Sequence, residues 1–401
     1  MTLTDSGASA APAGPRPGVS IGEVAPGFED VRSLFDEFLA RDADYSAQVC
    51  VYLHGRPVVD LSGGPHLGHL AMTGVFSSTK GVAALTLARL VERGDLDLET
   101  PVAAYWPEFA AHGKSAVSVS QLLSHQAGLV GVPGMRIAER YDSREVAAAL
   151  AAQRPFWRPG SAFGYHGTAI GPLMEELFRR IAGEELQEHY EREVRAPLGA
   201  DMFVGLPDSE EARYAPVLPP MRDAGGVAGT GAGGPERGLA DSLQAVAFFG
   251  GGPIDPSGAI EPNLRHLRAA GIASIGGVGN ARGLARVYAA AVTGVEGVDG
   301  GRPFLSSDTV DAFSQEQSWG VDRVLGRQMC FATVFQKPYA DAPWGSWRAI
   351  GHDGAAGSMG FADPEHGLAF GYVRRRMAVP GGLDALAVRL SGAVRAVVAR
   401  G

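Results

Sequence analysis

The amino-acid sequence predicts an α+β protein in which one antiparallel sheet, flanked by helices, is assembled from the two ends of the chain. The stretch from about 79 to 300 has mostly helical spacing of its apolar residues. Strand-like runs lie on both sides of this stretch, at 47–53, 57–64, 330–335, 346–350 and 367–373. Strands at both ends around a helical middle favour a sheet domain with a large, mainly helical domain inserted into it.

The same pattern predicts the division of the chain. Residues 1–24 are rich in Ala, Pro, Gly and Ser and are expected to form a flexible lead. Residues 25–110 together with 325–401 are expected to form the sheet domain, and 111–324 the mainly helical inserted domain. Because ligand sites occur preferentially between domains, we expect the active site in the cleft between the two parts.

Individual elements follow from local patterns. Apolar residues from Phe28 to Leu39 recur at helical spacing, which predicts an amphipathic helix. His54-Gly55-Arg56 is a short connection that suits a hairpin between the first two strands. Residues 224–238 carry little side-chain matter and predict a loop, and 383–400 predict a closing helix.

Composition excludes several classes of protein. The chain of 401 residues has a net charge of −9, which argues against nucleic acid as a partner. No run of 18 apolar residues is present, so no membrane association is expected. Cys50 and Cys330 lie in apolar runs and are expected to be buried thiols. The amino terminus lacks the basic and apolar regions of a secretory signal, which favours a cytoplasmic location.

The segment "FSSTK", residues 76–80, places serines and a lysine at the start of an apolar helix. Ser and Thr are also common helix N-caps, so the run alone is a weak signal. Ser77 and Lys80, three positions apart, lie on one helix face, where a partly buried and neutral lysine can take the serine proton. The helix N-terminus adds N–H groups that stabilise an oxyanion.

Two further polar segments carry candidate residues. Tyr165 in "GYHG" could act as a base if a cation such as Lys80 lowers its pKa, but taken alone it is better explained as a core aromatic residue with a hydrogen-bonded hydroxyl. His166 beside it is most simply a hydrogen-bonded loop histidine. His352-Asp353-Gly354 lies on a predicted strand rich in small residues, which indicates close approach of a ligand or another backbone.

In this order, "FSSTK", "GYHG" and "GHDGAAGSMGFADP" resemble the S-x-x-K, Y-x-N and K-T-G or H-x-G motifs of the serine β-lactamase and penicillin-binding-protein superfamily. Within it, the chain looks most like the class C-related carboxylesterases called family VIII. "QLLSHQAGL", "VRAPLGADMFVGLP" and "GVGNARGLARVYAAA" also look like that group, so the resemblance covers nearly the whole chain beyond residue 25.

The resemblance implies a β-lactamase-like fold and a role for each motif. Ser77 would be the acylated nucleophile, with Lys80 and Tyr165 sharing the general-base and general-acid work. Which of the two takes the first proton is left open. The backbone N–H groups of Ser77 and Ala355 would form the oxyanion hole. The residues expected to contact substrate are His166, His352, Asp353 and Gly354.

Two departures from the family motifs bear on the substrate. Gly167 stands where penicillin-recognising members carry an amide side chain, and His352 followed by Asp353 replaces the K-T-G lysine. An anionic β-lactam would therefore be attracted less, and an ester or thioester with a neutral or cationic acyl part fits better. Asp353 either faces the cleft or is hydrogen-bonded to nearby backbone and faces away.

The expected function is a serine hydrolase of the carboxylesterase type that acts on a small-molecule ester, thioester or amide. The alternative is an acyltransferase that passes the acyl group to an amine or alcohol acceptor. A β-lactamase or D-aminopeptidase is less favoured, and a silent binding protein is disfavoured by the intact Ser77, Lys80 and Tyr165. The histidines are scattered without metal-ligand spacing and no phosphate-binding motif is present, so neither metal nor cofactor is implied.

Overall fold

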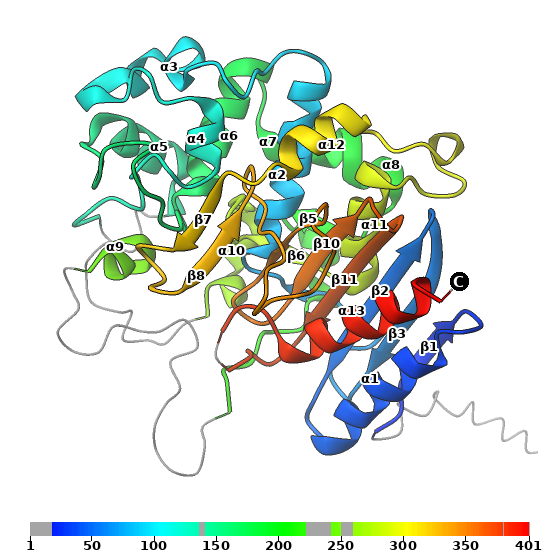
Figure 1. Cartoon of the computed structure of the whole chain (residues 1–401). Helices are drawn as coiled ribbons and strands as arrows, with labels where there is room; N and C mark the ends of the chain where they lie inside the picture. Colours follow the sequence, from blue (N-terminus) through cyan, green and yellow to red (C-terminus); the bar gives the residue numbers. More distant parts are fainter. Residues whose placement is uncertain (1–17, 136–140, 222–241, 250–259, 380, 401) are drawn as a thin grey trace, which may run out of the picture.

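Six strands form one antiparallel sheet that joins the two ends of the chain, which confirms the predicted fold class (Figure 1). The computed structural model describes residues 18–135, 141–221, 242–249, 260–379 and 381–400. The strand order is β1-β3-β2-β11-β10-β9. The bounds are β1 Ile21–Val24, β2 Ala47–Leu53, β3 Arg56–Gly63, β9 Ile350–Asp353, β10 Met359–Asp363 and β11 Leu368–Arg374. Pairing of β2 with β11 places Val51 opposite Phe370 and joins the two halves of the sheet.

The hairpin between β2 and β3 forms where the sequence predicts it. His54 and Gly55 both have positive φ values, 48° and 81°, as a two-residue turn of type I′ requires. The N–H of His54 donates to the carbonyl of Gly367 over 2.8 Å. This bond ties the hairpin to the turn between β10 and β11, so the two chain ends are joined beyond the ladder itself.

Three predictions about strands are wrong in part. Ile21–Val24 was expected within the flexible lead but forms β1, held by backbone pairing with β3, which the composition of a segment does not reveal. Of the expected strand 346–350 only Ile350 belongs to β9, because Ser346 turns the chain by donating its N–H to Asp363 over 2.8 Å. Of 330–335, only the first two residues belong to a strand.

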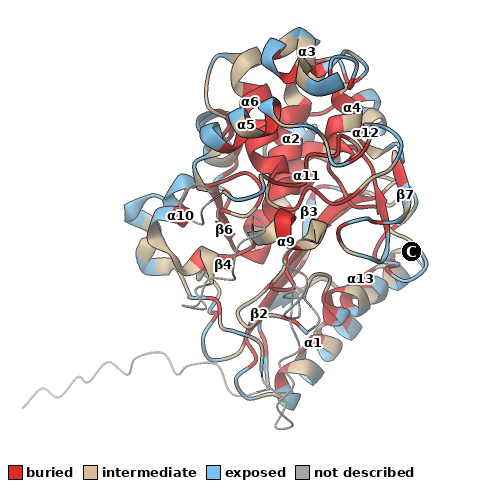
Figure 2. Cartoon of the chain, turned by 90° about the vertical axis from the view of Figure 1, so that its left-hand side faces the viewer, coloured by how far each residue is buried: buried red, intermediate tan, exposed pale blue. Residues whose placement is uncertain are grey.

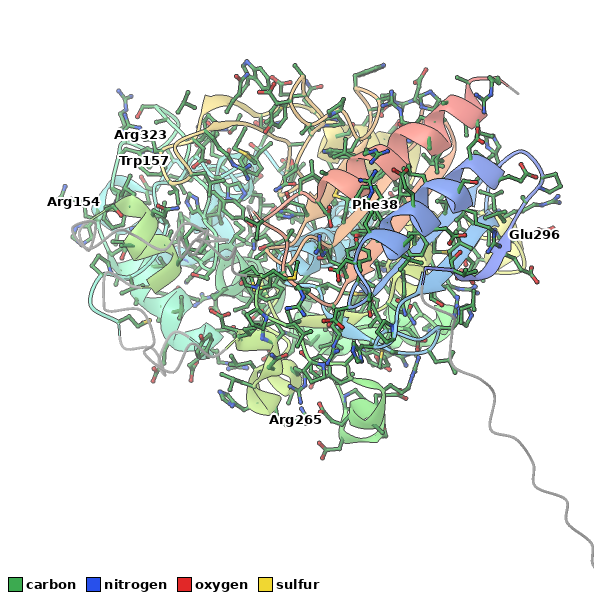
Figure 3. All side chains as sticks on the ribbon, turned by 90° about the horizontal axis from the view of Figure 1, so that it is seen from below. Phe38, Arg154, Trp157, Arg265, Glu296 and Arg323 are labelled. Carbon is green, nitrogen blue, oxygen red and sulfur yellow. The ribbon has the colours of Figure 1, made fainter. Side chains whose placement is uncertain are left out.

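Two layers of helices cover the sheet. On one face lie α1 (Glu29–Arg41) and α13 (Ala385–Val398), the two helices predicted near the chain ends. Phe35 of α1 and Leu390 of α13 share one apolar cluster with the sheet. Figure 3 shows Phe38 on α1, where the Arg389 guanidinium of α13 lies 5.0 Å from its ring. This layer therefore links both ends of the chain a second time.

The other face carries α11 (Ala281–Val292) and α2 (Ser78–Glu92), whose residues are largely buried (Figure 2). Gly371 of β11 allows α11 to approach closely, since a Cβ there would lie 2.1 Å from the carbonyl oxygen of Ala281. Gly360 beside it would meet the Tyr288 ring at 2.7 Å. The small residues of the predicted strand are thus used for close helix packing.

The middle of the chain is mainly helical and adds two small sheets. Its helices are α3 Val102–Tyr105, α4 Val119–Leu123, α5 Ser143–Ala152, α6 Ile170–Ala182, α7 Leu186–Tyr190, α8 Ala196–Leu198, α9 Leu243–Phe249, α10 Arg265–Ala270 and α12 Ser307–Ser314. The short strands are β4 Thr73–Gly74, β5 Met202–Val204, β6 Gly277–Gly279, β7 Ser318–Val321 and β8 Gln328–Phe331. The expected boundary between 324 and 325 falls inside the β7–β8 hairpin and needs correction, because the ladder pairs residues on both sides of it.

Two further findings concern the predicted loop and membrane-spanning helices. The predicted loop 224–238 lies outside the described residues. Within the described ranges, the structure contains no helix with the length and apolar character needed to cross a lipid bilayer.

Candidate active site

Ser77 lies at a tight strand-to-helix turn. β4 leads into Val75, whose N–H donates to the carbonyl of Gly277 over 3.0 Å, and α2 begins at Ser78. Phe76 between them has φ of 47°, which is unfavourable for a bulky residue and is typical of functional turns. The turn leaves Ser77 partly exposed at the N-terminus of a buried helix. A serine hydroxyl is thereby presented where helix N–H groups favour negative charge.

Lys80 is buried one turn away, on the same face as Ser77. Its Nζ lies 2.8 Å from Oγ of Ser77 and 2.8 Å from the carbonyl oxygen of Ser274. The side chain has no solvent exposure. Burial lowers the pKa of Lys80 well below its usual range, and the charge of Asp353 opposes this only in part. The amine is therefore able to be neutral and to accept a proton.

Tyr165 lies against the same two side chains. Its hydroxyl lies beside Ser77, and Nζ of Lys80 is 5.1 Å from the centroid of its ring. The ring stacks on Phe331 at 5.8 Å, and its backbone N–H donates to Asp322 over 2.8 Å. Burial raises the pKa of Tyr165 above its usual range. The lowered phenol pKa that a base would need is not present.

The end of β9 is bonded directly to the start of α2. Oγ of Ser78 donates to the carbonyl of His352 over 3.1 Å, and Ser358 donates to the carbonyl of Val75 over 2.7 Å. Gly354 permits this contact, because a Cβ there would lie 2.2 Å from the Val75 oxygen. Ala355, the next residue, is therefore held beside the turn that carries Ser77.

The backbone N–H groups of Ser77 and Ala355 remain available at this junction. Within the described ranges, neither is bonded to a carbonyl or to a side chain. Unpaired N–H groups at a helix N-terminus and at the end of a strand are what an oxyanion hole needs. The oxyanion-hole role that the sequence motif implies for Ala355 stays a prediction.

Ser78→Ala is expected to leave acylation of Ser77 within about threefold of the parent and to lower stability. Ser78 is a buried structural serine that joins α2 to β9 through His352 and Ser358. Losing these bonds is expected to cost about 1–3 kcal/mol of unfolding free energy. Denaturant unfolding and a p-nitrophenyl acetate assay measure the two effects separately. Loss of acylation with normal stability would instead make Ser78 the nucleophile.

His352 is a neutral imidazole in the position of the family lysine. Its Nδ1 lies 2.7 Å from the carbonyl oxygen of Asp353, so Nδ1 carries the proton. Nε2 is buried and has no hydrogen-bond partner in the described part of the chain. Burial, together with the nearby charge of Lys80, lowers the pKa of His352 to about 3. The site therefore has no cation where penicillin-recognising relatives carry one.

The Asp353 carboxyl is held by a hydrogen bond from another segment of the chain. Its Oδ1 accepts from Nε2 of Gln336 over 3.0 Å, and the N–H of Leu383 also bonds to it. Burial raises its pKa above the usual range for Asp. Asp353 lines a cavity of about 420 Å³ that includes none of Ser77, Lys80 and Tyr165. The Gln336 bond comes from a side chain of another segment and not from the nearby backbone, so whether Asp353 faces substrate stays a prediction.

His166 stabilises the fold through hydrogen bonds between its ring and the backbone. Nε2 accepts the N–H of Leu129 over 3.0 Å, and Nδ1 lies 2.7 Å from the carbonyl oxygen of Gly164. Burial lowers the pKa of His166 to about 4, so the ring is neutral. Both nitrogens are bonded to backbone, and the ring has no atom left for a substrate. This corrects the expectation that His166 contacts substrate.

Three contributors to the site have no signal in the sequence. Ser274 supplies a backbone carbonyl, which any residue type carries. Phe248 of α9 occupies the space beside Gly167, where a Cβ would lie 2.6 Å from its ring. Asp322 comes from the β7–β8 turn, far along the chain from Tyr165. Only the tertiary arrangement brings these groups to the motif residues.

A metal centre is not part of this arrangement. In the residues that the structure describes, no three His, Cys, Asp or Glu side chains gather as ligands for a metal ion. The groups around Ser77 are a buried amine, a phenol and backbone N–H donors.

Comparison with known proteins identifies the family of the chain. The β-lactamase family model matches residues 31–393 of the chain. Esterase/beta-lactamase LipL of Mycobacterium tuberculosis is 34% identical over 346 residues, which are 83% of this chain and 77% of LipL. The structure of EstA from Arthrobacter nitroguajacolicus is similar with a TM-score of 0.86 and 48% identity, covering 94% of this chain and 98% of EstA.

Two other solved structures are similar over nearly their whole length. A penicillin-binding-protein homolog from Caulobacter crescentus has a TM-score of 0.82 and 34% identity, covering 94% of this chain and 99% of the homolog. A family VIII carboxylesterase has a TM-score of 0.82 and 33% identity, with the same coverage.

The fold and these similarities define an enzyme of the β-lactamase-like hydrolase class. The chain belongs to the β-lactamase family.

Proposed function

We propose that this protein is a serine esterase that forms a covalent acyl-enzyme on Ser77. The observation that carries the proposal is the 2.8 Å contact between the buried Nζ of Lys80 and Oγ of Ser77. A serine hydroxyl becomes a nucleophile when a neighbouring group removes its proton. The names of LipL and of the family VIII carboxylesterase support an ester as the substrate.

In the proposed acylation, Oγ of Ser77 bonds to the carbonyl carbon while its proton passes to Nζ of Lys80. The N–H groups of Ser77 and Ala355 stabilise the oxyanion that forms. The bond to the leaving alcohol then breaks, Tyr165 protonates the alcohol oxygen, and the proton on Lys80 restores the phenol. In the second half, water attacks the acyl carbon while its proton passes to the same pair. The bond between that carbon and Oγ of Ser77 then breaks, the pair returns the proton to Oγ, and the carboxylic acid leaves.

The opposite pKa shifts of Lys80 and Tyr165 support this division of roles. Burial lowers the pKa of the amine and raises that of the phenol, so the neutral amine and the protonated phenol are the favoured forms. Neutral forms are the ones needed for a base and for an acid that donates to the leaving group. Lys80 is therefore the proposed acylation base and Tyr165 the proposed acid.

Neutral esters or thioesters are the proposed substrates. The neutral His352 gives a carboxylate no cation to bind, and Phe248 fills the space beside Gly167 where an amide side chain would recognise an acylamido group. Both features remove attraction for penicillins rather than for simple esters.

Intact-mass analysis of the protein mixed with p-nitrophenyl acetate or butyrate tests the function. A mass increase by one acyl group, absent in Ser77→Ala and decaying as acid appears, is the expected result. The same mixture with candidate amines tests acyl transfer, since an amide product would show that an amine replaces water. Ester hydrolysis that proceeds equally in Ser77→Ala would overturn the proposal.

Asp353→Asn is expected to change the preference between anionic and neutral acyl substrates by less than about twofold. The carboxyl is bonded to Gln336 and Leu383 and lines a cavity without the reacting residues. Steady-state rates on a charged and an uncharged ester measure the ratio, from which any general loss of active protein cancels. A gain of about tenfold for the anionic ester, worth roughly 1.4 kcal/mol, would mean that this charge faces substrate.

A further inference from the structure

The contact between Lys80 and Ser274 fixes the direction of the lysine amine. Nζ lies 2.8 Å from the Ser274 carbonyl and 2.8 Å from Ser77. A neutral amine that donates one N–H to this carbonyl can turn its lone pair to the serine hydroxyl. The place of one backbone oxygen therefore decides whether the amine is aimed at Ser77.

Ser274 belongs to a segment that packs against α6 and the residues just before it. Its Oγ donates to the carbonyl of Thr168 over 2.8 Å, just before α6 begins. Gly171 of α6 packs directly on it, since a Cβ there would lie 2.6 Å from the Ser274 nitrogen. The N–H of Ala273 donates to Oε1 of Glu175 over 2.6 Å. One carboxyl thus holds the Ile272–Ala273 peptide, two peptide units before the carbonyl that Lys80 contacts.

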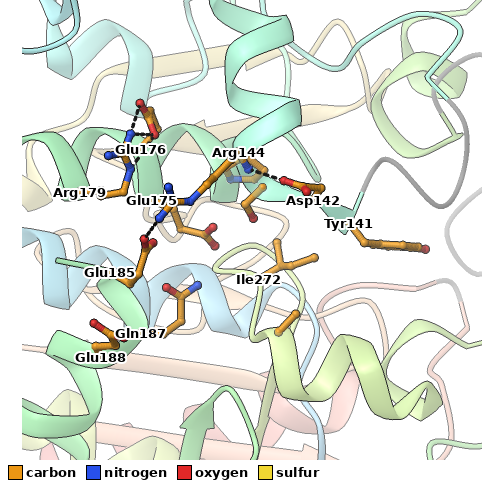
Figure 4. Close-up of a pocket in the computed structure, with 13 residues that line it drawn as sticks. Tyr141, Asp142, Arg144, Glu175, Glu176, Arg179, Glu185, Gln187, Glu188 and Ile272 are labelled. Carbon is orange, nitrogen blue, oxygen red and sulfur yellow. Dashed lines mark hydrogen bonds and ion pairs between the residues drawn. The ribbon is translucent and has the colours of Figure 1, made fainter.

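Glu175 is a buried carboxyl that is bonded to this segment through the Ala273 N–H. It is 6% exposed, and the side chains of Ser143 on α5 and Gln187 on α7 line the same cavity. Gln187 in turn donates to the carbonyl of Gly271 over 3.1 Å. Figure 4 shows Glu175, Gln187 and Ile272 around one cavity of about 420 Å³. Burying a carboxyl costs more free energy than burying an apolar side chain. A buried carboxyl at this position therefore indicates that it has a function.

We propose that Glu175 is a positioning residue that aims Lys80 at Ser77 by holding the Ile272–Ala273 peptide, two peptide units before the Ser274 carbonyl. The inference rests on the proposed function of Lys80 as the acylation base. Glu175 touches neither Ser77 nor substrate and acts through the backbone. Displacement of the Ser274 carbonyl is expected to slow acylation without weakening substrate binding.

Glu176, the next residue, provides a matched control. It is also largely buried, at 8% exposure, but its carboxyl pairs with Arg179 and Arg180 on the surface of α6. In Figure 4 it points to Arg179 and away from Ile272. Replacing it removes a buried carboxyl from the same helix without touching the Ala273 N–H.

The test compares Glu175→Gln, Glu175→Leu, Glu175→Asp and Glu176→Leu in the full chain. Single-turnover acylation by p-nitrophenyl butyrate is measured against ester concentration and pH, together with thermal unfolding. Glu175→Leu is expected to slow the maximal acylation rate about 10- to 100-fold, as a misplacement of about 1 Å does, with an unchanged half-saturating ester concentration. It should also shift the pH at which acylation falls. Glu175→Gln keeps an oxygen for the Ala273 N–H and is expected to stay within about threefold of the parent.

Glu175→Asp keeps the charge but draws the carboxyl back from Ala273, so it gives the same test if the leucine variant does not fold. A slowed acylation in Glu175→Asp, with full rate in Glu175→Gln and Glu176→Leu, supports the proposal. Equal acylation in the Glu175 variants and Glu176→Leu, or a change only in half-saturation, overturns it. A parent enzyme that is never acylated on Ser77 would refute the proposed function instead.

Discussion

Ser77→Ala is expected to abolish acylation, with a loss of at least about 10⁴-fold in esterase rate. The substitution removes the hydroxyl that lies beside both Lys80 and Tyr165. It removes no bond between α2 and β9, because Ser78 and Ser358 make those. Thermal stability should therefore stay close to that of the parent. Initial rates on p-nitrophenyl acetate and intact mass after mixing measure the effect.

Ser78→Ala is the natural comparison for this variant. The two serines are neighbours, but one is partly exposed at the turn and the other is fully buried. An active, less stable Ser78→Ala together with an inactive, stable Ser77→Ala is the expected pair of results. The reverse pair would show that the nucleophile is assigned to the wrong serine.

Lys80→Ala and Tyr165→Phe are each expected to slow acylation by about 10²- to 10⁴-fold, the usual worth of general acid–base catalysis. Both groups lie against the same Ser77 hydroxyl, so we expect them to act as a unit. The double variant should therefore lose far less than the product of the two single losses. Pre-steady-state rates on one activated ester give the full cycle. Losses that multiply would indicate independent roles.

The pH dependence of acylation should report Lys80. The base must be unprotonated, so the rate is expected to fall about tenfold per pH unit below the lowered pKa of the amine. The same shift affects stability. The unfolded lysine, with a pKa of about 10.4, binds a proton that the folded one does not, so its contribution to stability is present at high pH and is lost as the pH falls towards the folded value. In Lys80→Ala, this pH dependence is expected to disappear from both the acylation rate and the free energy of unfolding.

Much of the fold could be predicted because local sequence patterns determine many of its helices, strands and turns. The helix near Phe35, the His54-Gly55 turn and β11 follow from apolar spacing and turn chemistry. The strand Ile21–Val24 could not be, because its residues are mostly exposed and only pairing with β3 makes it a strand. Local composition carries no information on a partner that lies some 40 residues away.

The candidate site divides in the same way. Ser77 and Lys80 are within one helical turn, so their contact follows from sequence spacing alone. The sequence did not show whether Lys80 or Tyr165 is suited to act as the base. Burial shifts both pKa values, and burial is a property of the whole fold. The orientation of Asp353 likewise depended on Gln336, a residue on another segment.

The sequence by itself therefore determined the fold class and the family motifs, through periodicity and short spacings that need no distant partner. The tertiary structure alone decided how the amine is buried, that His166 is bonded to backbone, and that the Ser274 carbonyl, Phe248 and Glu175 lie beside the motif residues. The physical reason is that desolvation and backbone hydrogen bonds depend on what surrounds a group in space. Residues that are far apart in the chain supply those surroundings, and no local pattern encodes them.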